Sequence, residues 1–403
     1  MRSVAVVGAS LAGWRAAQEL REQGFDGRLT LIGAEHRPPY DRPPLSKEFL
    51  SGHLDPAELA LGDPEEEDDL DAEWRLGRTA VRLDPRTGTV TLDGGDQVRA
   101  DGVVAATGAS RSTITGAPTV PGSHLVYTLD DALALRESVG AGSRVVVVGG
   151  GLTGSEVAST CRSLGARVTL VEGQHVPLVH TLGIEIASLC LALHEDHGVR
   201  LRCGTRAARV LGTERVTGVE LTDGRVVPAD VVAVCVGAHP TTEWLRGSGV
   251  RTRQGVLTDA GCVTRLRNVV AVGDVAQYQS GNHAHTTRTG YWSHAMNQPT
   301  TAVRNLLAGS TIARCTAVPH FWSRQYGCSV QFAGEAMPKD KIEVVDGSTK
   351  ARKFVATYRR GGRLVAVFAM NDPKRFAAYR RKLTANSVPG SGRTARTAPT
   401  APG

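Results

Sequence analysis

Long hydrophobic runs are absent from this sequence. Nowhere in its 403 residues does an apolar stretch approach the ~18 residues that a membrane-spanning helix requires. The apolar run VAVV that precedes Gly8 is also too short for the core of a signal peptide. We therefore expect a cytoplasmic protein.

Cysteine is sparse and scattered. The closest neighbours among the seven cysteines, such as Cys190 and Cys203, are 13 residues apart. This spacing excludes a disulfide framework and a CxxC redox or metal pair. We expect these residues to be ordinary buried or surface thiols.

Aromatic residues make up only 5% of the chain, but its 41% of hydrophobic residues is typical of a globular protein with two or three domains. Acidic residues are nearly missing from the end of the chain. Residues 347–403 contain 13 Lys or Arg and one acid, Asp372, so this segment carries a net charge of +12 and residues 1–346 carry −5. Such an asymmetry indicates either a docking surface for an acidic partner or a solvated basic face and tail.

The sequence contains two copies of one pattern. SVAVVGASLAG (3–13) and RVVVVGGGLTG (144–154) each run from a short β-branched strand into a glycine-rich turn and a helix. A second strand follows each helix, and later VRADGVVAATGA (98–109) aligns without a gap with VPADVVAVCVGA (227–238). Strands and helices in this order predict right-handed crossovers and parallel sheets, and thus an α/β fold with two Rossmann-like dinucleotide-binding domains.

The glycines have a physical role in this pattern. The tight turn, the approach of the backbone to a pyrophosphate and the packing of helix on strand each leave no room for a Cβ, and the helix N-terminus offers free N–H groups to the phosphates. Ser10 replaces the middle glycine of the first copy. The glycines of the two turns are Gly8 and Gly13 in the first copy and Gly149, Gly151 and Gly154 in the second.

An acidic residue ends the second strand of each copy. Glu35 lies 27 residues after Gly8, and Glu172 lies 23 residues after Gly149. A carboxylate at this place accepts hydrogen bonds from ribose hydroxyls and repels a 2′-phosphate. Two such sites in one chain predict two dinucleotides, and the simplest pair is a permanently held flavin and an exchangeable nicotinamide.

The sequence resembles the FAD-dependent pyridine nucleotide-disulfide oxidoreductase superfamily, and within it the ferredoxin reductases of bacterial oxygenase systems. The resemblance covers about residues 2 to 382. It is carried by GASLAG near the start, YDRPPLSK (40–47), ATGAS (106–110), GGGLTGSEVA (149–158), NVVAVGDVA (268–276), YWSHAMNQP (291–299) and HFWSRQYG (320–327).

This resemblance implies a domain organisation. Both nucleotide-binding domains are expected to be of the three-layer ββα type. The implied parts are an FAD-binding domain at 1–115 and 240–312, an inserted NAD-binding domain at 116–239, a small α/β interface domain at 313–385 and a disordered tail at 386–403.

The segment RPPYDRPPLSKEFL (37–50) carries a single lysine, Lys47, after its prolines. Proline fixes φ and lacks a donor, so we expect residues 37–46 to form an extended arm rather than a helix. In the family the lysine of PPLSK lies beside flavin N5, where its ammonium group stabilises negative charge on the reduced ring. The resemblance also implies a pairing with Glu156. The alternatives are an exposed lysine and a surface glutamate on a helix.

Three further residues match functional positions of the family. Asp274 corresponds to an aspartate that binds the FAD ribityl chain, although it could instead cap a helix. Trp292 corresponds to an aromatic residue near flavin and nicotinamide. Trp322 corresponds to a tryptophan at the flavin edge where an iron–sulfur partner docks, with core packing as its alternative.

The sequence also departs from the family pattern. Gly290 stands where a glutamate is frequent, which puts the nicotinamide side in doubt, and no arginine follows Glu172 in EGQHVPL, which argues against NADPH. The first 160 residues contain no cysteine, so no thiol relay is available and electrons must leave directly from the flavin. HAH at 283–285 is expected to be a loop rather than a metal site.

The resemblance implies Lys47, Glu156 and Trp292 as catalytic residues. The expected cofactor-binding residues are Gly8, Ser10, Ala12, Gly13, Glu35, Arg42, Lys47, Ala80, Thr107, Gly108, Arg111, Gly149, Gly151, Leu152, Thr153, Gly154, Glu156, Glu172, Gly237, Gly273, Asp274 and Trp292.

The implied activity is that of an NADH-dependent, FAD-containing ferredoxin reductase. FAD would take a hydride from NADH and release single electrons to an acidic [2Fe–2S] or related ferredoxin that feeds an oxygenase. The alternatives are a quinone, small-molecule or oxygen acceptor, and a flavin-holding interaction protein. The sequence leaves open whether the protein is a monomer or a dimer. The basic residues expected to steer the ferredoxin are Arg359, Arg360, Arg363, Lys374 and Arg375.

Overall fold

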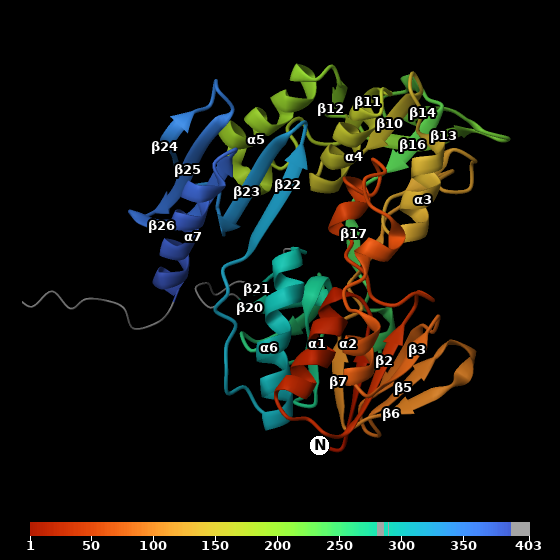
Figure 1. The fold of residues 1–403 in the computed structure, drawn as a ribbon, viewed down its shortest axis with the longest axis vertical. Coiled ribbons are helices and arrows are strands. Elements are labelled where there is room, and N and C mark those ends of the chain that lie inside the picture. The colour runs from red at the N-terminus through yellow and green to blue at the C-terminus, as the bar shows by residue number, and fades with distance from the viewer. Residues whose placement is uncertain (280–285, 289, 388–403) are drawn as a thin grey trace, which may run out of the picture.

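The computed structural model describes residues 1–279, 286–288 and 290–387. The chain forms three units, seen in Figure 1 as a lower unit, an upper unit and a third unit beside the upper one. No helix in the described ranges is long and apolar enough to cross a membrane.

The first unit is built on a five-stranded parallel sheet in the order β19-β7-β1-β2-β3. Side chains on a strand alternate between the two faces of the sheet, so Val4 and Val6 of β1 point to one face and Ala5 and Val7 to the other. The strands are β1 (Ser3–Val7), β2 (Arg28–Gly33), β3 (Ala72–Leu76), β7 (Gly102–Ala105) and β19 (Val269–Ala271).

Two layers cover this sheet. Helices α1 (Leu11–Glu22) and α6 (Trp292–Ala308) pack on the face of Val4 and Val6. The antiparallel sheet β4-β5-β6 packs on the opposite face, which gives three layers. Its strands are β4 (Ala80–Asp84), β5 (Thr89–Leu92) and β6 (Gln97–Arg99), while α2 (Pro64–Asp69) and a small sheet of β18 (Val256–Thr258), β20 (Ala276–Gln279) and β21 (Thr286–Thr287) lie outside these layers.

The second unit repeats this plan. Its parallel sheet has the order β12-β11-β10-β16-β9, with α4 on one face and the antiparallel sheet β13-β14-β15 on the other. The strands of the parallel sheet are β9 (Ser123–Leu125), β10 (Arg144–Val148), β11 (Arg167–Glu172), β12 (Arg200–Cys203) and β16 (Val231–Val234). The other elements are α3 (Leu129–Ser138), α4 (Leu152–Ser163), α5 (Val179–Asp196), β13 (Ala207–Gly212), β14 (Val216–Leu221) and β15 (Val226–Pro228).

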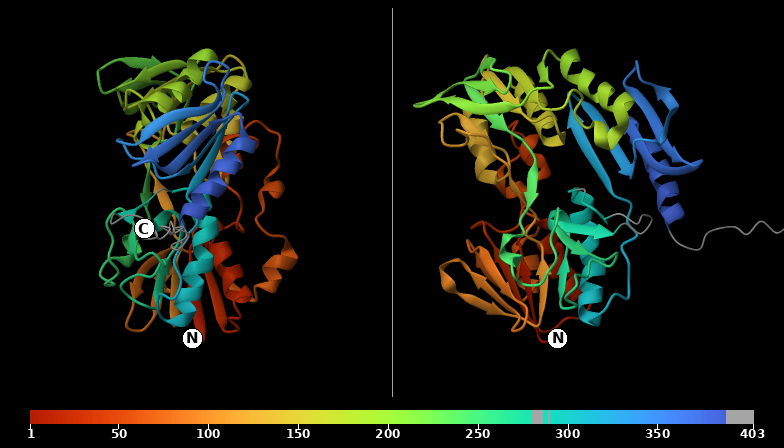
Figure 2. Two further views of the ribbon diagram at one scale, coloured as in Figure 1. Left: turned by 90° about the vertical axis from the view of Figure 1, so that its left-hand side faces the viewer. Right: turned by 180° about the vertical axis from the view of Figure 1, so that it is seen from behind.

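The two units differ in one connection. The edge strand β9 of the second unit precedes β10, the strand that leads into the glycine-rich turn. The matching edge strand β19 of the first unit comes after the whole second unit. The chain leaves the first unit through β8 (Ala109–Arg111) and returns through β17 (Ala238–Pro240), and these two strands pair with each other. They form the link between the lower and upper units in Figures 1 and 2.

The third unit is a five-stranded antiparallel sheet in the order β22-β23-β26-β25-β24. One face packs against α5 of the second unit and the other against α7. The elements are β22 (His320–Gln325), β23 (Cys328–Gly334), β24 (Lys341–Ser348), β25 (Lys353–Arg360), β26 (Arg363–Met370) and α7 (Pro373–Ser387).

The expected fold class is confirmed, because both parallel sheets, their three layers and the small third unit are present. The exact domain boundaries stay predictions. One detail of the tail is wrong: α7 continues through residues 386 and 387, where the tail was expected to begin, and residues 388–403 lie outside the described part of the chain.

Candidate functional site

A cavity of about 670 Å³ lies where the three units meet. The first unit contributes the turn after β1, the arm at residues 40–47 and the segment 106–111. The second unit contributes Glu156, and the third contributes Trp322.

The glycine turn after β1 is as tight as the sequence predicts. Gly8 has φ +115°, and a Cβ there would lie 2.1 Å from the carbonyl oxygen of Ala106. A Cβ on Gly13 would lie 1.7 Å from the carbonyl oxygen of Gly8, so α1 packs directly on the turn. Ser10 is the N-cap of α1 and lines the cavity, and no described side chain caps the first N–H groups of this helix. These donors are available to a phosphate.

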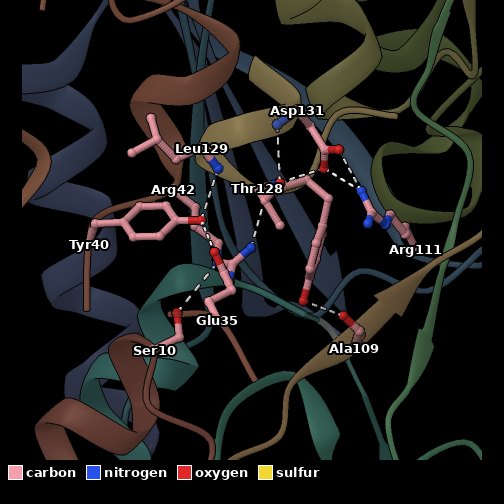
Figure 3. Close-up of polar contacts among 10 residues, drawn as sticks. Ser10, Glu35, Tyr40, Arg42, Ala109, Arg111, Thr128, Leu129 and Asp131 are labelled. Atoms are coloured by element: carbon pink, nitrogen blue, oxygen red, sulfur yellow. Dashed lines mark hydrogen bonds and ion pairs between the residues drawn. The ribbon is translucent and has the colours of Figure 1, made fainter. Parts of the chain in front are cut away.

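Glu35 and Arg42 meet at the wall of this cavity (Figure 3). The Glu35 carboxylate accepts hydrogen bonds from the Tyr40 hydroxyl at 2.7 Å and from the Arg42 guanidinium at 2.5 Å. Arg42 also donates to the Tyr127 carbonyl at 2.7 Å and lies 4.4 Å above the Tyr127 ring. Sequence reasoning missed Tyr127, because it belongs to no motif and reaches the site only through the fold.

Five more of the expected residues belong to the first unit. Ala12, Ala80, Thr107, Gly108 and Arg111 all line the cavity. Arg111 forms an ion pair with Asp131 at the start of α3, which is drawn in Figure 3. Its guanidinium is therefore already neutralised by a carboxylate of the second unit.

Asp274 enters the cavity at the end of β19. Gly273 precedes it with φ +71°, and a Cβ on Gly273 would lie 2.9 Å from the Cβ of Ala12. Burial raises the pKa of the Asp274 carboxyl, while the charges of Arg288 and Arg42 lower it. Gly290 faces this carboxylate, because a Cβ there would lie 3.7 Å from Asp274 Oδ2.

Lys47 and Glu156 form an ion pair between the first and second units. Lys47 Nζ lies 2.8 Å from Glu156 Oε2, and the two side chains are 11% and 7% exposed. The alternatives of an exposed lysine and a surface glutamate are therefore wrong. Both residues line the cavity.

Glu156 lies on α4 of the second unit and accepts hydrogen bonds from side chains of the other two units. Besides Lys47, Ser46 Oγ donates to Glu156 Oε2 at 2.5 Å, and Ser323 Oγ of β22 donates to Oε1 at 2.8 Å. Ser323 is fully buried and in turn accepts a bond from Gln325 Nε2 at 3.0 Å. A buried carboxylate is stabilised by several such donors. No sequence motif pointed to Ser323, which lies 167 residues away from Glu156.

Replacing Ser323 with alanine is expected to lower the free energy of unfolding by about 1–3 kcal/mol, because it leaves Glu156 Oε1 and the Gln325 amide without their partner. Chemical denaturation measures this change. Ser329→Ala on the neighbouring strand β23 is the matched control, since no hydrogen bond of the Ser329 side chain is recorded within the described ranges. Equal stability of the two variants would show that Ser323 does not anchor Glu156.

The third unit is fixed against the second by the hairpin that follows β22. The Tyr326 hydroxyl lies 2.7 Å from His194 Nδ1, and the Tyr326 N–H donates to Ser159 Oγ at 2.7 Å. Burial lowers the pKa of His194 to about 4, so this contact holds a neutral imidazole at pH 7. The contact fixes the position of β22 and thereby that of Ser323 and Trp322.

Trp292 and Trp322 lie together at the cavity. Their rings are 5.3 Å apart in an edge-to-face arrangement, and Trp292 Nε1 donates to Asp41 Oδ1 at 2.9 Å. Burial raises the pKa of Asp41, while the Trp292 hydrogen bond and the Lys47 charge lower it. Trp292 begins α6 and Trp322 lies on β22, so the first and third units each supply one indole.

The second glycine turn is built like the first. A Cβ on Gly149 would lie 2.6 Å from the carbonyl oxygen of Cys235, and one on Gly154 would lie 1.9 Å from that of Gly149. Gly151 faces open space, since a Cβ there would meet no described atom within 4 Å. Leu152 and Thr153 at the start of α4 line the large cavity.

Glu172 holds this second turn in place. Its carboxylate accepts hydrogen bonds from Gly150 N at 2.7 Å and from Gln174 N at 2.8 Å. Gly237, between β16 and β17, has φ +39°, and a Cβ there would lie 3.3 Å from Ser112 Oγ. Neither Glu172 nor Gly237 lines the cavity between the three units, so they belong to a separate part of the site.

The proline-rich arm at 37–46 differs in part from the expected structure. The arm at 37–46 is not extended throughout, because residues Pro43–Ser46 form a single turn of 3₁₀-helix. Proline has the φ that this turn needs, and its missing N–H is not required in the first turn. The HAH segment at 283–285 lies outside the described residues.

The residues of the first unit fit a bound FAD. They combine a turn closed to any Cβ, uncapped N–H groups of α1 and a cavity whose volume lies within the usual range for cofactor sites. The second turn offers the same donors to a second dinucleotide, because no described side chain caps α4 either.

Comparison with known proteins gives matches along nearly the whole chain. A family model described as pyridine nucleotide-disulphide oxidoreductase matches residues 2–299, and one described as reductase C-terminal matches residues 320–399. The chain is 33% identical to rhodocoxin reductase of Rhodococcus erythropolis, with 96% of this chain and 90% of that protein covered. It is 35% identical to the ferredoxin reductase component of chlorobenzene dioxygenase from Cupriavidus sp. (strain PS12), with 96% and 93% covered.

A solved structure also matches. The reductase fold in the crystal structure of the covalent putidaredoxin reductase–putidaredoxin complex superposes with a TM-score of 0.90 at 28% identity, covering 95% of this chain and 93% of that one.

Proposed function

The chain belongs to the pyridine nucleotide-disulphide oxidoreductase family, and from this premise we propose that it is an FAD-dependent NADH:ferredoxin reductase. It oxidises NADH and passes the electrons to a ferredoxin that serves an oxygenase. Relatives named as ferredoxin reductase components of dioxygenase systems support this activity. The observation that carries the proposal is the buried Lys47–Glu156 pair in a cavity suited to a dinucleotide.

FAD would be held by the turn from Gly8 to Gly13, by Glu35, Arg42 and Asp274. When bound, FAD accepts two electrons together from NADH and releases them one at a time. NADH would be held by the second turn, with its adenosine ribose at Glu172.

Within this site the protein supplies charge and shape. We assign to Lys47 the task of stabilising negative charge next to the bound ring, in a place where burial keeps the ammonium group poorly screened by water. Glu156 holds the ammonium group in position. Trp292 and Trp322 close the edge of the cavity against water.

No disulphide takes part in this proposal, despite the family name. None of the residues that line the cavity is a cysteine. Electrons therefore leave the flavin for the partner directly, and Trp322 lies on the path that we propose. A cytoplasmic location is part of the proposal, because the enzyme needs the NADH pool.

The cofactor assignment is tested by heat release of the flavin from the purified protein and chromatography of the supernatant. We expect one FAD per chain, non-covalently bound. Recovery of FMN or of no flavin would contradict the proposal. Turnover with NADH and a panel of [2Fe–2S] ferredoxins, compared with quinones and oxygen, identifies the acceptor.

Two of the five basic residues expected to steer the ferredoxin are already paired with acidic residues. Arg360 is not free to steer a partner, because it donates to both carboxylate oxygens of Asp340 at 2.7 and 2.8 Å. Arg375 likewise pairs with Asp372. The Arg375–Asp372 pair is a local contact between residues three positions apart, whereas Asp340 reaches Arg360 only because the fold brings together residues 20 positions apart.

Arg380 is better placed for an acidic ferredoxin. It is exposed on α7, and its charge contributes, after burial, to the lowered pKa of His320. The His320 ring lies 6.4 Å from the ring of Trp322, which lines the cavity, so the Arg380 charge acts on a residue next to the cavity edge.

Ferredoxin reduction is expected to slow several-fold between low salt and about 0.5 M salt, because screening weakens the steering of an acidic partner. Flavin reduction by NADH should change much less. Arg380→Glu should slow only the ferredoxin half-reaction, whereas Lys350→Glu, at the turn between β24 and β25, should have little effect. Stopped-flow measurement of each half-reaction checks this. An equal response of both half-reactions to salt would show that the basic segment is a solvated face and does not steer the ferredoxin.

A further inference from the structure

One pair of cysteines is in sulfur–sulfur contact. Cys262 Sγ lies 3.4 Å from Cys315 Sγ, although the two residues are 53 positions apart in the sequence. All seven cysteines are within the described ranges, and no other two of them make such a contact. Cys262 lies in the turn between β18 and β19, and Cys315 lies in the linker from α6 to β22.

The turn that carries Cys262 is rigid. Cys262 is fully buried and has φ +65°, a left-handed conformation that is uncommon for a residue with a Cβ. The Asp259 carboxylate accepts hydrogen bonds from Gly261 N at 2.8 Å and Val263 N at 3.0 Å, and Ala271 N donates to the Cys262 carbonyl. These bonds hold the Cys262 sulfur at a fixed place.

The linker that carries Cys315 is held against this turn. The buried Asn305 side chain accepts bonds from Ile312 N and Ala313 N and donates to the carbonyl of Gly261. Cys315 N donates to the Ala260 carbonyl at 2.8 Å. The fold therefore brings the two sulfurs together before any bond forms, which removes most of the entropy cost of joining them.

The two thiols are unequal in a way that suits stepwise oxidation. Cys315 is partly exposed, whereas Cys262 is buried. The hydrogen bond from the Cys262 thiol lowers the pKa of Cys315, and a thiol with a lowered pKa is the better nucleophile at neutral pH. Cys315 is thus accessible to an oxidant from solvent, whereas Cys262 is buried and can react only with Cys315.

We propose that Cys262 and Cys315 form a redox modification site that a hydroperoxide converts to a disulfide. Cys315 attacks the peroxide, forms a sulfenic acid and releases water or an alcohol. Cys262 then attacks the Cys315 sulfur, the sulfenic acid oxygen leaves as a molecule of water, and the disulfide forms. The two thiols together lose two electrons, which reduce the peroxide. The sulfurs must approach to about 2.05 Å, and the side chain of the partly exposed Cys315 is the one that can move.

The crosslink would join the first unit to the linker that leads into the third. It would close a loop that contains all of α6. Trp292 at the start of α6 lines the cavity, whereas Cys315 lies beyond the other end of this helix of 17 residues. The disulfide should therefore raise thermal stability without changing NADH turnover.

The test uses the purified flavin-loaded protein, treated with hydrogen peroxide and analysed by mass spectrometry under non-reducing conditions. We expect a mass loss of about 2 Da from the lost hydrogens, a peptide pair joined through residues 262 and 315, and a melting temperature raised by a few degrees. Dithiothreitol should reverse all three changes.

Three variants make the result specific. Cys315→Ser and Cys262→Ala should abolish the crosslink and the thermal shift, while Cys203→Ser on β12 should retain both. Oxidation of Cys315 to a sulfinic acid without a crosslink would overturn the proposal, as would a disulfide between any other pair. If Cys262→Ala lowers the yield of folded protein, Cys315→Ser at the partly exposed position still decides the matter.

Discussion

Replacing Lys47 with methionine is expected to slow the reduction of bound flavin by NADH about 100-fold, the size of effect seen when one donor to a developing negative charge is lost. Methionine keeps most of the side-chain volume but removes the ammonium group. Binding of NADH should weaken much less, because the charge acts where it develops in the transition state rather than on the bound substrate. Anaerobic rapid mixing separates the two quantities through the dependence of the rate on NADH concentration.

The effect of Lys47→Met can be attributed to the lost ammonium group for two reasons. Glu156 keeps the hydrogen bonds from Ser46 and Ser323 when Lys47 is changed, so the surroundings of the carboxylate are largely preserved. Lys339→Met, at an exposed position of the third unit, removes one positive charge away from the cavity. If the Lys47→Met variant has full flavin content and an unchanged rate of flavin reduction, the role assigned to Lys47 is wrong.

The second large effect concerns the choice of nicotinamide. We expect kcat/KM for NADH to exceed that for NADPH by at least about tenfold, or on the order of 1.4 kcal/mol of discrimination. The Glu172 carboxylate is fixed by Gly150 N and Gln174 N, so it cannot turn away from a 2′-phosphate. No arginine follows it to offset the repulsion.

A double variant, Glu172→Ala with Gln174→Arg, should shrink or invert this preference. Because Glu172 also holds the glycine turn, KM for both nucleotides should rise in Glu172→Ala alone, while the ratio between them falls. The FAD content serves as the control and should not change, since Glu172 does not line the cavity between the three units. Equal use of NADH and NADPH by the unmodified protein would contradict the role assigned to Glu172.

The local patterns of this chain determine a large part of the fold. Strand, glycine turn and helix follow one another within a dozen residues, so both parallel sheets and their turns could be predicted from the sequence. The contact between Lys47 and Glu156 was expected only because two motifs matched a family in which they meet. Without that resemblance, nothing in the sequence would join residues 109 positions apart.

The rest depends on contacts that only the folded chain makes. Ser323 reaches Glu156 because the β22 hairpin docks on α4 and α5 through Tyr326. Cys262 and Cys315 meet because Asn305 ties the linker back to the first unit. The net charge of the final segment was a poor guide for the same reason, since the fold pairs Arg360 with Asp340, which lies before β24.

In the function proposed for this chain, electrons pass from NADH through bound FAD to a ferredoxin. The most direct test is an anaerobic double-mixing experiment on the purified protein, in which NADH is added first and an oxidised [2Fe–2S] ferredoxin second. We predict that NADH bleaches the flavin absorbance and that the ferredoxin restores it, with two ferredoxin molecules reduced for each NADH oxidised. A flavin that stays reduced in the presence of every ferredoxin tried, but is reoxidised by quinone or oxygen, would contradict electron transfer to a ferredoxin.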